Sequence, residues 1–281
     1  MDPASNPLSK HFRQPKTYIK LPSDGNWWPE GSLDMPPNHE LPVFSMTGRD
    51  ELMMRNADAL MNGNATVEMI QSCMPNIKDG WNIPRSDLDV IILAIRIATY
   101  GPEMNVNSRC PHCEAQNENT VDCRWVLDNI QQPEWDKMIS LGDLLLKLRP
   151  APYRVVNELN LDSYEENKLI AQLSQEGLSD DQRRDIMLRT MKKMAGALAD
   201  RLAASIESII TPEGQKVSNQ SMIRDFINNA DKGMFDALRT AMAEFSAGYN
   251  LPRMKIQCES CDKVYETNLE FDPANFFALA S

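Results

Sequence analysis

Cys110-Pro111-His112-Cys113 and Cys258-Glu259-Ser260-Cys261 are two copies of the pattern C-x-x-C, and a long insertion separates them in the sequence. A C-x-x-C turn presents two sulfurs to one metal ion at about 2.3 Å, and two such turns complete a tetrahedral zinc site. We therefore predict that Cys110, Cys113, Cys258 and Cys261 bind one structural Zn²⁺. This metal would tie the middle of the chain to its C-terminal part.

The residues around the two cysteine pairs predict a zinc ribbon that the insertion splits in two. Short extended runs precede both pairs, Asn105-Val106-Asn107 in the first half and Lys255-Ile256 in the second. Alternating residues that are typical of strands follow both pairs. They are Asn119, Val121, Cys123 and Trp125 after the first pair and Tyr265, Thr267, Leu269 and Phe271 after the second.

Other cysteine chemistry fits these pairs less well. Six cysteines allow three disulfides, but C-x-x-C pairs in a mid-sized, Met-rich chain favour a metal in a reducing compartment. A redox dithiol is expected at a helix start after a buried strand, and neither pair has this setting. Four thiolates leave no open position for catalysis, so we expect a structural site. We interpret Cys73 and Cys123 as small buried residues and His112 as facing solvent.

The composition favours protein partners over nucleic acid or membranes. The chain has 281 residues, of which 29 are basic and 40 acidic, and its formal net charge is −11. Phosphate backbones would be repelled, so we expect no nucleic-acid partner. No apolar run is long enough to cross a bilayer, and the first ten residues lack the pattern of a signal peptide. We expect a soluble chain, made in the cytosol, with no membrane partner.

The sequence carries no recognisable pattern of an enzyme. Its histidines are His11, His39 and His112, and none lies in an H-E-x-x-H pattern or near a Gly-framed serine. A phosphate loop and a dinucleotide fingerprint are also missing from the sequence. We therefore expect no catalytic residues, no cofactor other than zinc and no small-molecule substrate.

The N-terminal residues 1–46 are rich in proline and in large apolar side chains. Eight prolines prevent helix formation and predict an extended arm. The apolar side chains are too many for a segment that stays in water, so the arm should pack on its own core or on a neighbour. They are Phe12, Tyr18, Ile19, Leu21, Trp27, Trp28, Leu33, Leu41, Val43 and Phe44.

Helical periodicity covers most of the remaining sequence. Thr47-x-x-Asp50 resembles a capping box and predicts a helix that ends at Gly63, with a second helix over 65–74. A helix that opens at Ser86 is apolar nearly all round and therefore buried, so Arg96 within it needs a partner. The clearest helix spans about 179–210, where we interpret the methionines as core residues. Its apolar positions are Met187, Met191, Met194, Leu198, Leu202, Ile206 and Ile209.

These features predict an α+β fold that is predominantly α-helical, with a split zinc ribbon and an extended Pro-rich N-terminal arm. We divide the chain into the arm (1–46), a helical segment (47–101), the first half of the ribbon (102–125), a helical insertion (126–251), and the second half of the ribbon with the C-terminal tail (252–281). Within the insertion, Thr211 to Gly214 is an expected turn that two shorter amphipathic helices follow.

Further motifs lie on both sides of the cysteine pairs. Those before the first pair are Lys20-Leu21-Pro22-Ser23, Leu41-Pro42-Val43, Met46-Thr47-Gly48-Arg49-Asp50-Glu51-Leu52, Asp58-Ala59-Leu60-Met61-Asn62-Gly63, Ile70-Gln71-Ser72-Cys73-Met74-Pro75-Asn76-Ile77, Asp87-Leu88-Asp89 and Ala94-Ile95-Arg96-Ile97-Ala98-Thr99-Tyr100-Gly101. The last is Leu269-Glu270-Phe271-Asp272-Pro273-Ala274-Asn275-Phe276-Phe277. With both cysteine pairs, these motifs resemble the T4-type bacteriophage baseplate protein family, which groups the baseplate hub proteins with their assembly factors.

The resemblance implies a structural or assembly protein of a contractile-tailed phage, in the hub region of the baseplate. Its partners would be other phage tail and baseplate proteins, and it would reside in the virion tail baseplate and, during assembly, in the host cytoplasm. We expect the N-terminal arm and the strand edges of the ribbon to contact these partners. A transient hub assembly chaperone that leaves the virion is one alternative. A zinc-ribbon regulator that binds nucleic acid is another.

Overall fold

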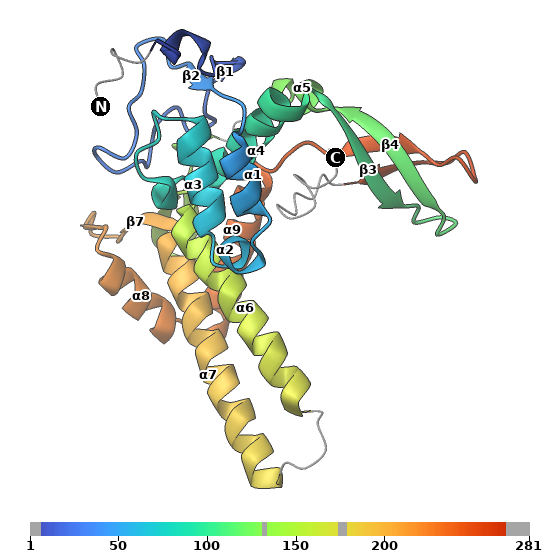
Figure 1. The fold of residues 1–281 in the computed structure, drawn as a ribbon. Coiled ribbons are helices and arrows are strands. Elements are labelled where there is room, and N and C mark those ends of the chain that lie inside the picture. The colour runs from blue at the N-terminus through green and yellow to red at the C-terminus, as the bar shows by residue number, and fades with distance from the viewer. Residues whose placement is uncertain (1–6, 131–133, 174–178, 268–281) are drawn as a thin grey trace. The chain divides into compact units, whose positions relative to one another are not determined.

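The computed structural model describes residues 7–130, 134–173 and 179–267, and these combine α-helices with four small antiparallel sheets (Figure 1). The chain forms two compact units. The first comprises Met1–Gly80, Asp87–Ile130 and Leu251–Ser281, and the second comprises Trp81–Ser86 and Gln131–Asn250. The expected mixture of α and β structure is confirmed. Among the described helices, none is both long and apolar enough to cross a membrane.

The helices of the first unit include one that is buried nearly all round. They are α1 (Gly48–Met54), α2 (Ala57–Met61), α3 (Asn64–Cys73), α5 (Cys123–Asp128) and most of α4 (Arg85–Tyr100). As the sequence predicts, α4 is buried nearly all round, and every residue from Val90 to Arg96 is buried. The Arg96 guanidinium donates to the carbonyl oxygens of Gly101 and Glu103, at 3.3 and 3.2 Å. This buried cation therefore fixes the backbone at Gly101 and Glu103, just after the helix ends.

The N-terminal segment packs on the core of the first unit, which is one of the two alternatives that the sequence left open. It contains a short 3-10 helix, η2 (Ser9–His11), and two strands, β1 (Thr17–Ile19) and β2 (Leu41–Val43), that pair antiparallel. Leu21, Leu41 and Val43 are at most 2% exposed, so their side chains belong to the core of this unit. Prolines disfavour an α-helix in this segment, but they do not keep it away from the core.

Two buried carboxylates hold the N-terminal segment in place. Asp87 accepts hydrogen bonds from the backbone N–H of Ser23 at 2.8 Å and from the indole N–H of Trp28 at 2.9 Å. Asp50 lies 3.6 Å from the guanidinium of Arg13. Both contacts join residues before position 30 to helices that come later in the chain.

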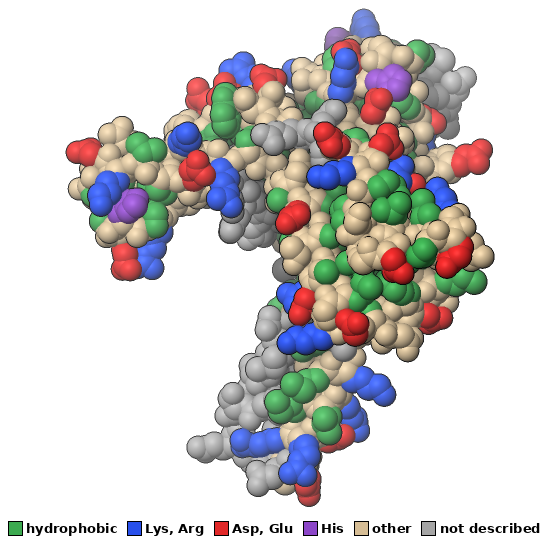
Figure 2. Space-filling view, turned by 180° about the vertical axis from the view of Figure 1, so that it is seen from behind, with side chains coloured by type: hydrophobic (Ala, Val, Ile, Leu, Met, Phe, Trp, Pro, Cys, Tyr) green, Lys and Arg blue, Asp and Glu red, His purple; other side chains and the backbone are tan. Residues whose placement is uncertain are grey.

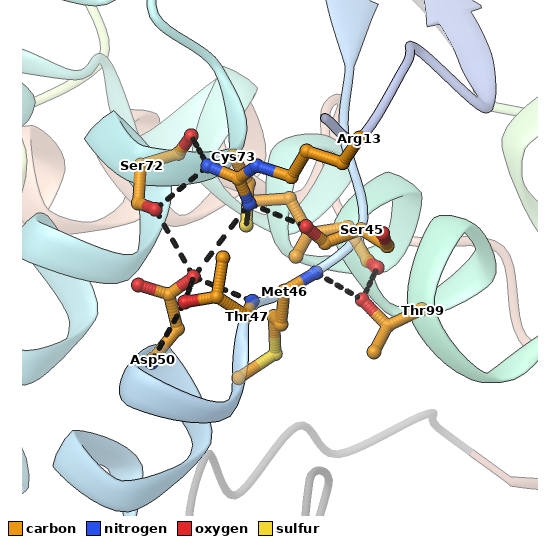
Figure 3. A network of polar contacts seen from close by, with 9 residues as sticks. Arg13, Ser45, Met46, Thr47, Asp50, Ser72, Cys73 and Thr99 are labelled. Atoms are coloured by element: carbon orange, nitrogen blue, oxygen red, sulfur yellow. Dashed lines mark hydrogen bonds and ion pairs between the residues drawn. The ribbon is translucent and has the colours of Figure 1, made fainter. Parts of the chain in front are cut away.

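The network around Arg13 is shown in Figure 3, where the guanidinium points into a group of oxygen acceptors. It donates to the carbonyl oxygens of Ser45 and Ser72 and to the Ser72 hydroxyl. Asp50 also accepts from the Thr47 backbone N–H at 2.7 Å and from the Ser72 hydroxyl at 3.0 Å. The predicted capping box at Thr47 is confirmed, with Asp50 as its third helical residue. One carboxylate thus connects the N-terminal segment, the start of α1 and the end of α3.

The second unit is a four-stranded antiparallel sheet with helices. The strands are β5 (Met138–Leu141), β6 (Leu144–Leu148), β7 (Ile206–Ile210) and β8 (Lys216–Val217), in that spatial order. The helices are α6 (Tyr153–Leu173), α7 (Asp180–Ala204), α8 (Gln220–Asn229) and α9 (Lys232–Ala247), which follow the short 3-10 helix η3 (Gly80–Asn82) in the chain. The core combines Leu146 and Leu148 from the sheet with Leu202, Ile223 and Leu238 from three of the helices.

Three predicted elements end earlier than the sequence suggested. The helix predicted from Thr47 to Gly63 breaks at Arg55, because the Asn56 side chain accepts a hydrogen bond from Ala59 N–H and starts α2. The strand predicted to reach Trp125 ends at Asp122, whose side chain caps α5 in the same way. The helix predicted to reach Ile210 ends at Ala204. The Ile-Glu-Ser-Ile-Ile run after it is strand β7, which its β-branched residues favour.

The interpretation of the methionines as core residues is wrong for the outer part of α7. Met187, Met191 and Met194 are 52%, 56% and 45% exposed. The buried apolar positions of α7 that the structure describes lie in its last two turns, at Ala199, Leu202 and Ala203, and Thr190 is a buried polar position further out. The turn at Thr211 to Gly214 and the amphipathic helices α8 and α9 agree with the prediction.

We predict that Asp50→Asn lowers the free energy of unfolding of the first unit by about 2–3 kcal/mol, because Arg13 loses its buried ionic partner. Urea unfolding followed by circular dichroism measures this change. Asp58→Asn is the matched control, since Asp58 is an exposed first-turn residue of α2 and its replacement should change stability by less than about 1 kcal/mol. Equal urea midpoints for the two variants would contradict a structural role for the Arg13 network.

Candidate metal centre

The first cysteine pair lies in the turn of a regular hairpin. Strand β3 (Glu103–Arg109) pairs with β4 (Gln116–Asp122), and the last pair of the register joins Arg109 to Gln116. In the turn, Cys110 N–H donates to the Ala115 carbonyl and Glu114 N–H donates to the Cys110 carbonyl, both at 2.9 Å. Glu114 adopts a φ of +61°, the left-handed conformation that lets the chain turn back beneath the cysteines.

The second pair repeats this geometry at the end of the chain that the structure describes. Strand β9 (Met254–Gln257) pairs with β10 (Val264–Thr267). Cys258 N–H donates to the Lys263 carbonyl at 3.0 Å, and Asp262 N–H donates to the Cys258 carbonyl at 2.9 Å. Asp262 has a φ of +56°. Both turns therefore place their cysteines at equivalent positions of one backbone motif.

The two turns face one another and bring all four sulfurs together. The sulfurs of Cys110 and Cys261 are 3.8 Å apart, those of Cys113 and Cys258 are 3.5 Å apart, and the four atoms lie within 4.8 Å of one another. A disulfide needs about 2.05 Å, so these thiols are not paired covalently. Sulfurs at the corners of a tetrahedron around zinc are about 3.8 Å apart when each Zn–S distance is about 2.3 Å. The separations and the donor set thus fit one zinc ion.

A buried polar network joins the two hairpins beside the sulfurs. The Tyr265 hydroxyl lies 2.7 Å from the Ser108 hydroxyl and accepts from the Asn117 amide at 3.2 Å. The Asn117 amide oxygen accepts from the Glu259 backbone N–H at 3.0 Å. Tyr265 and Asn117 are 6% and 2% exposed, so the hydrogen bonds are shielded from water. These residues fix the second cysteine turn against the first hairpin.

The electrostatics of the cluster favour a bound cation. Burial raises the pKa of the Cys258 thiol, but hydrogen bonds from Ser260, Cys261 and the neighbouring thiols outweigh it and lower this pKa to about 6. Next to it, a backbone hydrogen bond from Ala115 favours the Cys113 thiolate. The nearby sulfurs of Cys258, Cys261 and Cys110 outweigh that bond and raise the Cys113 pKa to about 12. One thiolate therefore suppresses its neighbour, and a divalent cation among the sulfurs would remove this repulsion.

The structure brings together all four cysteines that the sequence singled out, and leaves the other candidates apart. His112 is exposed, and Cys73 and Cys123 are fully buried, as expected. Burial raises the pKa of Cys73 to about 12, which makes it an unreactive thiol. Leu269 and Phe271, which were predicted to continue the last strand, lie outside the described residues. The sequence did not indicate Asn117, because a polar residue on a strand gives no local sign that it will be buried.

Comparisons with known proteins agree with the resemblance seen in the sequence motifs. A family model described as T4 bacteriophage base plate protein matches residues 15–278. This range includes both cysteine turns, the whole second unit and most of the first unit. No curated protein and no solved structure matches the chain.

We predict that Cys258→Ser reduces the zinc content from about one ion per chain to less than about 0.1 and lowers the melting temperature. Serine keeps the size of the side chain but is a poor ligand for zinc. Metal content by inductively coupled plasma mass spectrometry and melting by calorimetry measure the two effects. Cys123→Ala is the control, because Cys123 is buried outside the cluster and its replacement should leave zinc bound. Full zinc occupancy in Cys258→Ser would exclude Cys258 as a ligand.

We also predict that the number of thiols open to alkylation changes in two steps. The native zinc-bound protein should react slowly at all of its six cysteines, because four are held by the metal and two are buried. A chelator should expose Cys110, Cys113, Cys258 and Cys261, and a denaturant should then expose Cys73 and Cys123. Intact-mass spectrometry after iodoacetamide treatment counts the labels. A chelator that leaves the label count unchanged would argue against a metal at this cluster.

Proposed function

The chain belongs to the T4 bacteriophage base plate protein family, and from this premise we propose that it is a structural or assembly component of the hub region of a contractile-tailed phage baseplate. It acts by docking to other tail proteins, and a structural zinc ion holds the docking scaffold in shape. The family match covers residues 15–278 and is the observation that carries this proposal. Placement in the hub rests on the motifs that resemble hub proteins and their assembly factors.

The metal centre supports a structural role for zinc. Four thiolates complete a tetrahedral shell and leave no position at which a substrate or water would react. The cysteine turns are joined by buried hydrogen bonds from the Asn117 amide to the Tyr265 hydroxyl and from the Glu259 backbone N–H to the Asn117 oxygen, so a bound metal would rigidify a preformed arrangement. A site of this kind stabilises a surface for contact and does not contribute chemistry of its own.

The charge of the chain supports proteins as its partners. A net charge of −11 opposes binding to nucleic acid and to anionic membranes, whereas it is compatible with basic or mixed surfaces on tail proteins. The N-terminal segment, which the sequence suggested as a docking arm, contributes mainly to the core of its own unit. Only a few of its apolar side chains, such as Leu8, Phe12 and Tyr18, remain exposed for contact.

Particle composition tests the proposal. We predict that quantitative mass spectrometry of purified virions detects the protein together with the baseplate proteins, and that deletion of its gene leaves incomplete baseplates in electron micrographs of lysates. Incomplete baseplates together with absence of the protein from virions would reject a structural component and identify a transient assembly chaperone. Complete baseplates in the deletion strain would reject both roles. Expression of the wild-type chain from a plasmid is the control that assigns the defect to this gene.

A further inference from the structure

The outer part of α7 carries an apolar strip that the structure leaves uncovered. Met187, Leu188, Met191 and Met194 are 52%, 60%, 56% and 45% exposed. They lie within two turns of one helix, so they form a continuous surface and not scattered single residues. Figure 2 shows hydrophobic side chains gathered on the lower helical part of the view, where α7 begins, with Lys and Arg side chains beside them.

The spacing of this strip is that of a helix-packing seam. The apolar positions 187, 191, 194, 198 and 202 follow one another at steps of four, three, four and four, the spacing that places knobs against a partner helix. The inner end of the seam is covered, since Leu202 is 4% exposed and lies in the core of the second unit with Ala199 and Ala203. The seam is therefore buried at its inner end and exposed to solvent at its outer end.

The side of α7 that faces away from this seam contacts α6. Lys193 forms an ion pair with Asp162 of α6 at 2.8 Å, and Thr190 is buried. Lys193 lies about 160° from Met191 around the helix, whereas Thr190 lies only about 60° from Met187, at the edge of the seam. Packing of α6 on α7 thus accounts for one face and leaves the methionine face for something else.

The charges around the strip have the opposite sign to the chain as a whole. Arg184 lies one turn before Met187 on the same side, and Lys192 lies one turn after Leu188. The nearest acid, Asp185, forms an ion pair with Arg189 at 2.8 Å and is thereby neutralised. A methionine strip beside arginine and lysine is complementary to an apolar seam beside glutamate or aspartate.

We propose that residues 183–194 of α7 are a docking surface for an amphipathic helix of another protein, one with an apolar seam flanked by acidic side chains. This inference deepens the proposed function, because it gives the location and the chemistry of one docking surface. Methionine suits such a surface, since its flexible side chain adapts to the shape of a partner helix.

A second copy of this chain fits the surface less well than an acidic helix. In a two-fold contact the same patch meets itself, so a surface that carries Arg184 and Lys192 would meet a second surface of the same positive charge. The net charge of −11 adds repulsion between two whole chains and between the chain and an anionic bilayer. Charge therefore selects a partner with an acidic helical face.

Binding of designed helical peptides tests the surface. The probes are two fluorescent 21-residue peptides with the same leucine seam, one flanked by glutamate and the other by lysine. For the full zinc-bound chain we expect the glutamate peptide to bind about tenfold more tightly in fluorescence anisotropy at low salt. The triple variant Met187→Gln, Met191→Gln, Met194→Gln should lose about tenfold of this affinity. The double variant Arg184→Glu, Lys192→Glu should reverse the preference.

The matched controls are Met222→Gln and Leu52→Gln, which change equally exposed apolar side chains on α8 and α1. They should bind like the wild-type chain. All of these positions are exposed, so circular dichroism should show unchanged folding.

Equal binding of both peptides, or equal binding by the triple variant and the wild-type chain, would overturn the proposal. A concentration-dependent dimer in sedimentation that the triple variant abolishes would assign the surface to a second copy. Methionine-dependent binding to phosphatidylserine vesicles would assign it to membranes.

A complementation assay separates this inference from the proposed function. In a phage that lacks the gene, the triple variant should fail to restore plaques, whereas the Met222→Gln variant should restore them. If the deletion blocks baseplate assembly but the triple variant restores it fully, the docking surface is rejected and the baseplate role stands. If the deletion has no effect on assembly, the baseplate role is rejected, and the peptide measurements alone decide whether the surface binds acidic helices.

Discussion

The convergence of four sulfurs from two distant hairpins is the constraint on which the first unit depends. Residues after Asp122 must leave the hairpin of β3 and β4, form the second unit, and return so that Cys258 and Cys261 meet Cys110 and Cys113. Closing so long a loop is entropically unfavourable, and a metal that binds both ends offsets part of this cost. The hydrogen bonds of Asn117 and Tyr265 act in the same direction, since each joins residues on opposite sides of the insertion.

The sequence predicts the clustering of the four cysteines better than the surrounding fold, for physical reasons that particular residues show. Cysteine spacing is local, and the chemistry of thiolates restricts what two such pairs can do. Ile206 and Ile209 fit both a helical period and a strand, so α7 and β7 merge into one predicted helix. Prolines before residue 46 disfavour an α-helix, but they do not reveal that Leu41 and Val43 are buried. Burial of Asn117 depends on Glu259 and Tyr265, which no local pattern connects to it.

Buried polar groups give the first unit its specific arrangement. Asp50 and Asp87 are each almost completely buried, and each accepts hydrogen bonds from residues far away in the sequence. A carboxylate in such a place is unfavourable unless its partners are in position, so it stabilises one arrangement of the chain and disfavours others. For a protein whose role is contact with other proteins, a uniquely fixed scaffold matters as much as overall stability. The N-terminal segment, held by Arg13 and Ser23, is part of that scaffold.

The apolar residues of α7 keep one spacing along the helix, although the inner ones lie in the core of the second unit and the outer ones are exposed. The apolar positions of α7 keep their spacing from Met187 to Leu202, yet only the inner residues are covered by the core of their own unit. Intrinsic helix propensity does not require apolar residues at the outer positions, because lysine, arginine and glutamate form helices equally well. The outer methionines are therefore explained by packing against something outside the chain. Arginine and lysine beside them, in a chain of net charge −11, indicate that this partner is acidic.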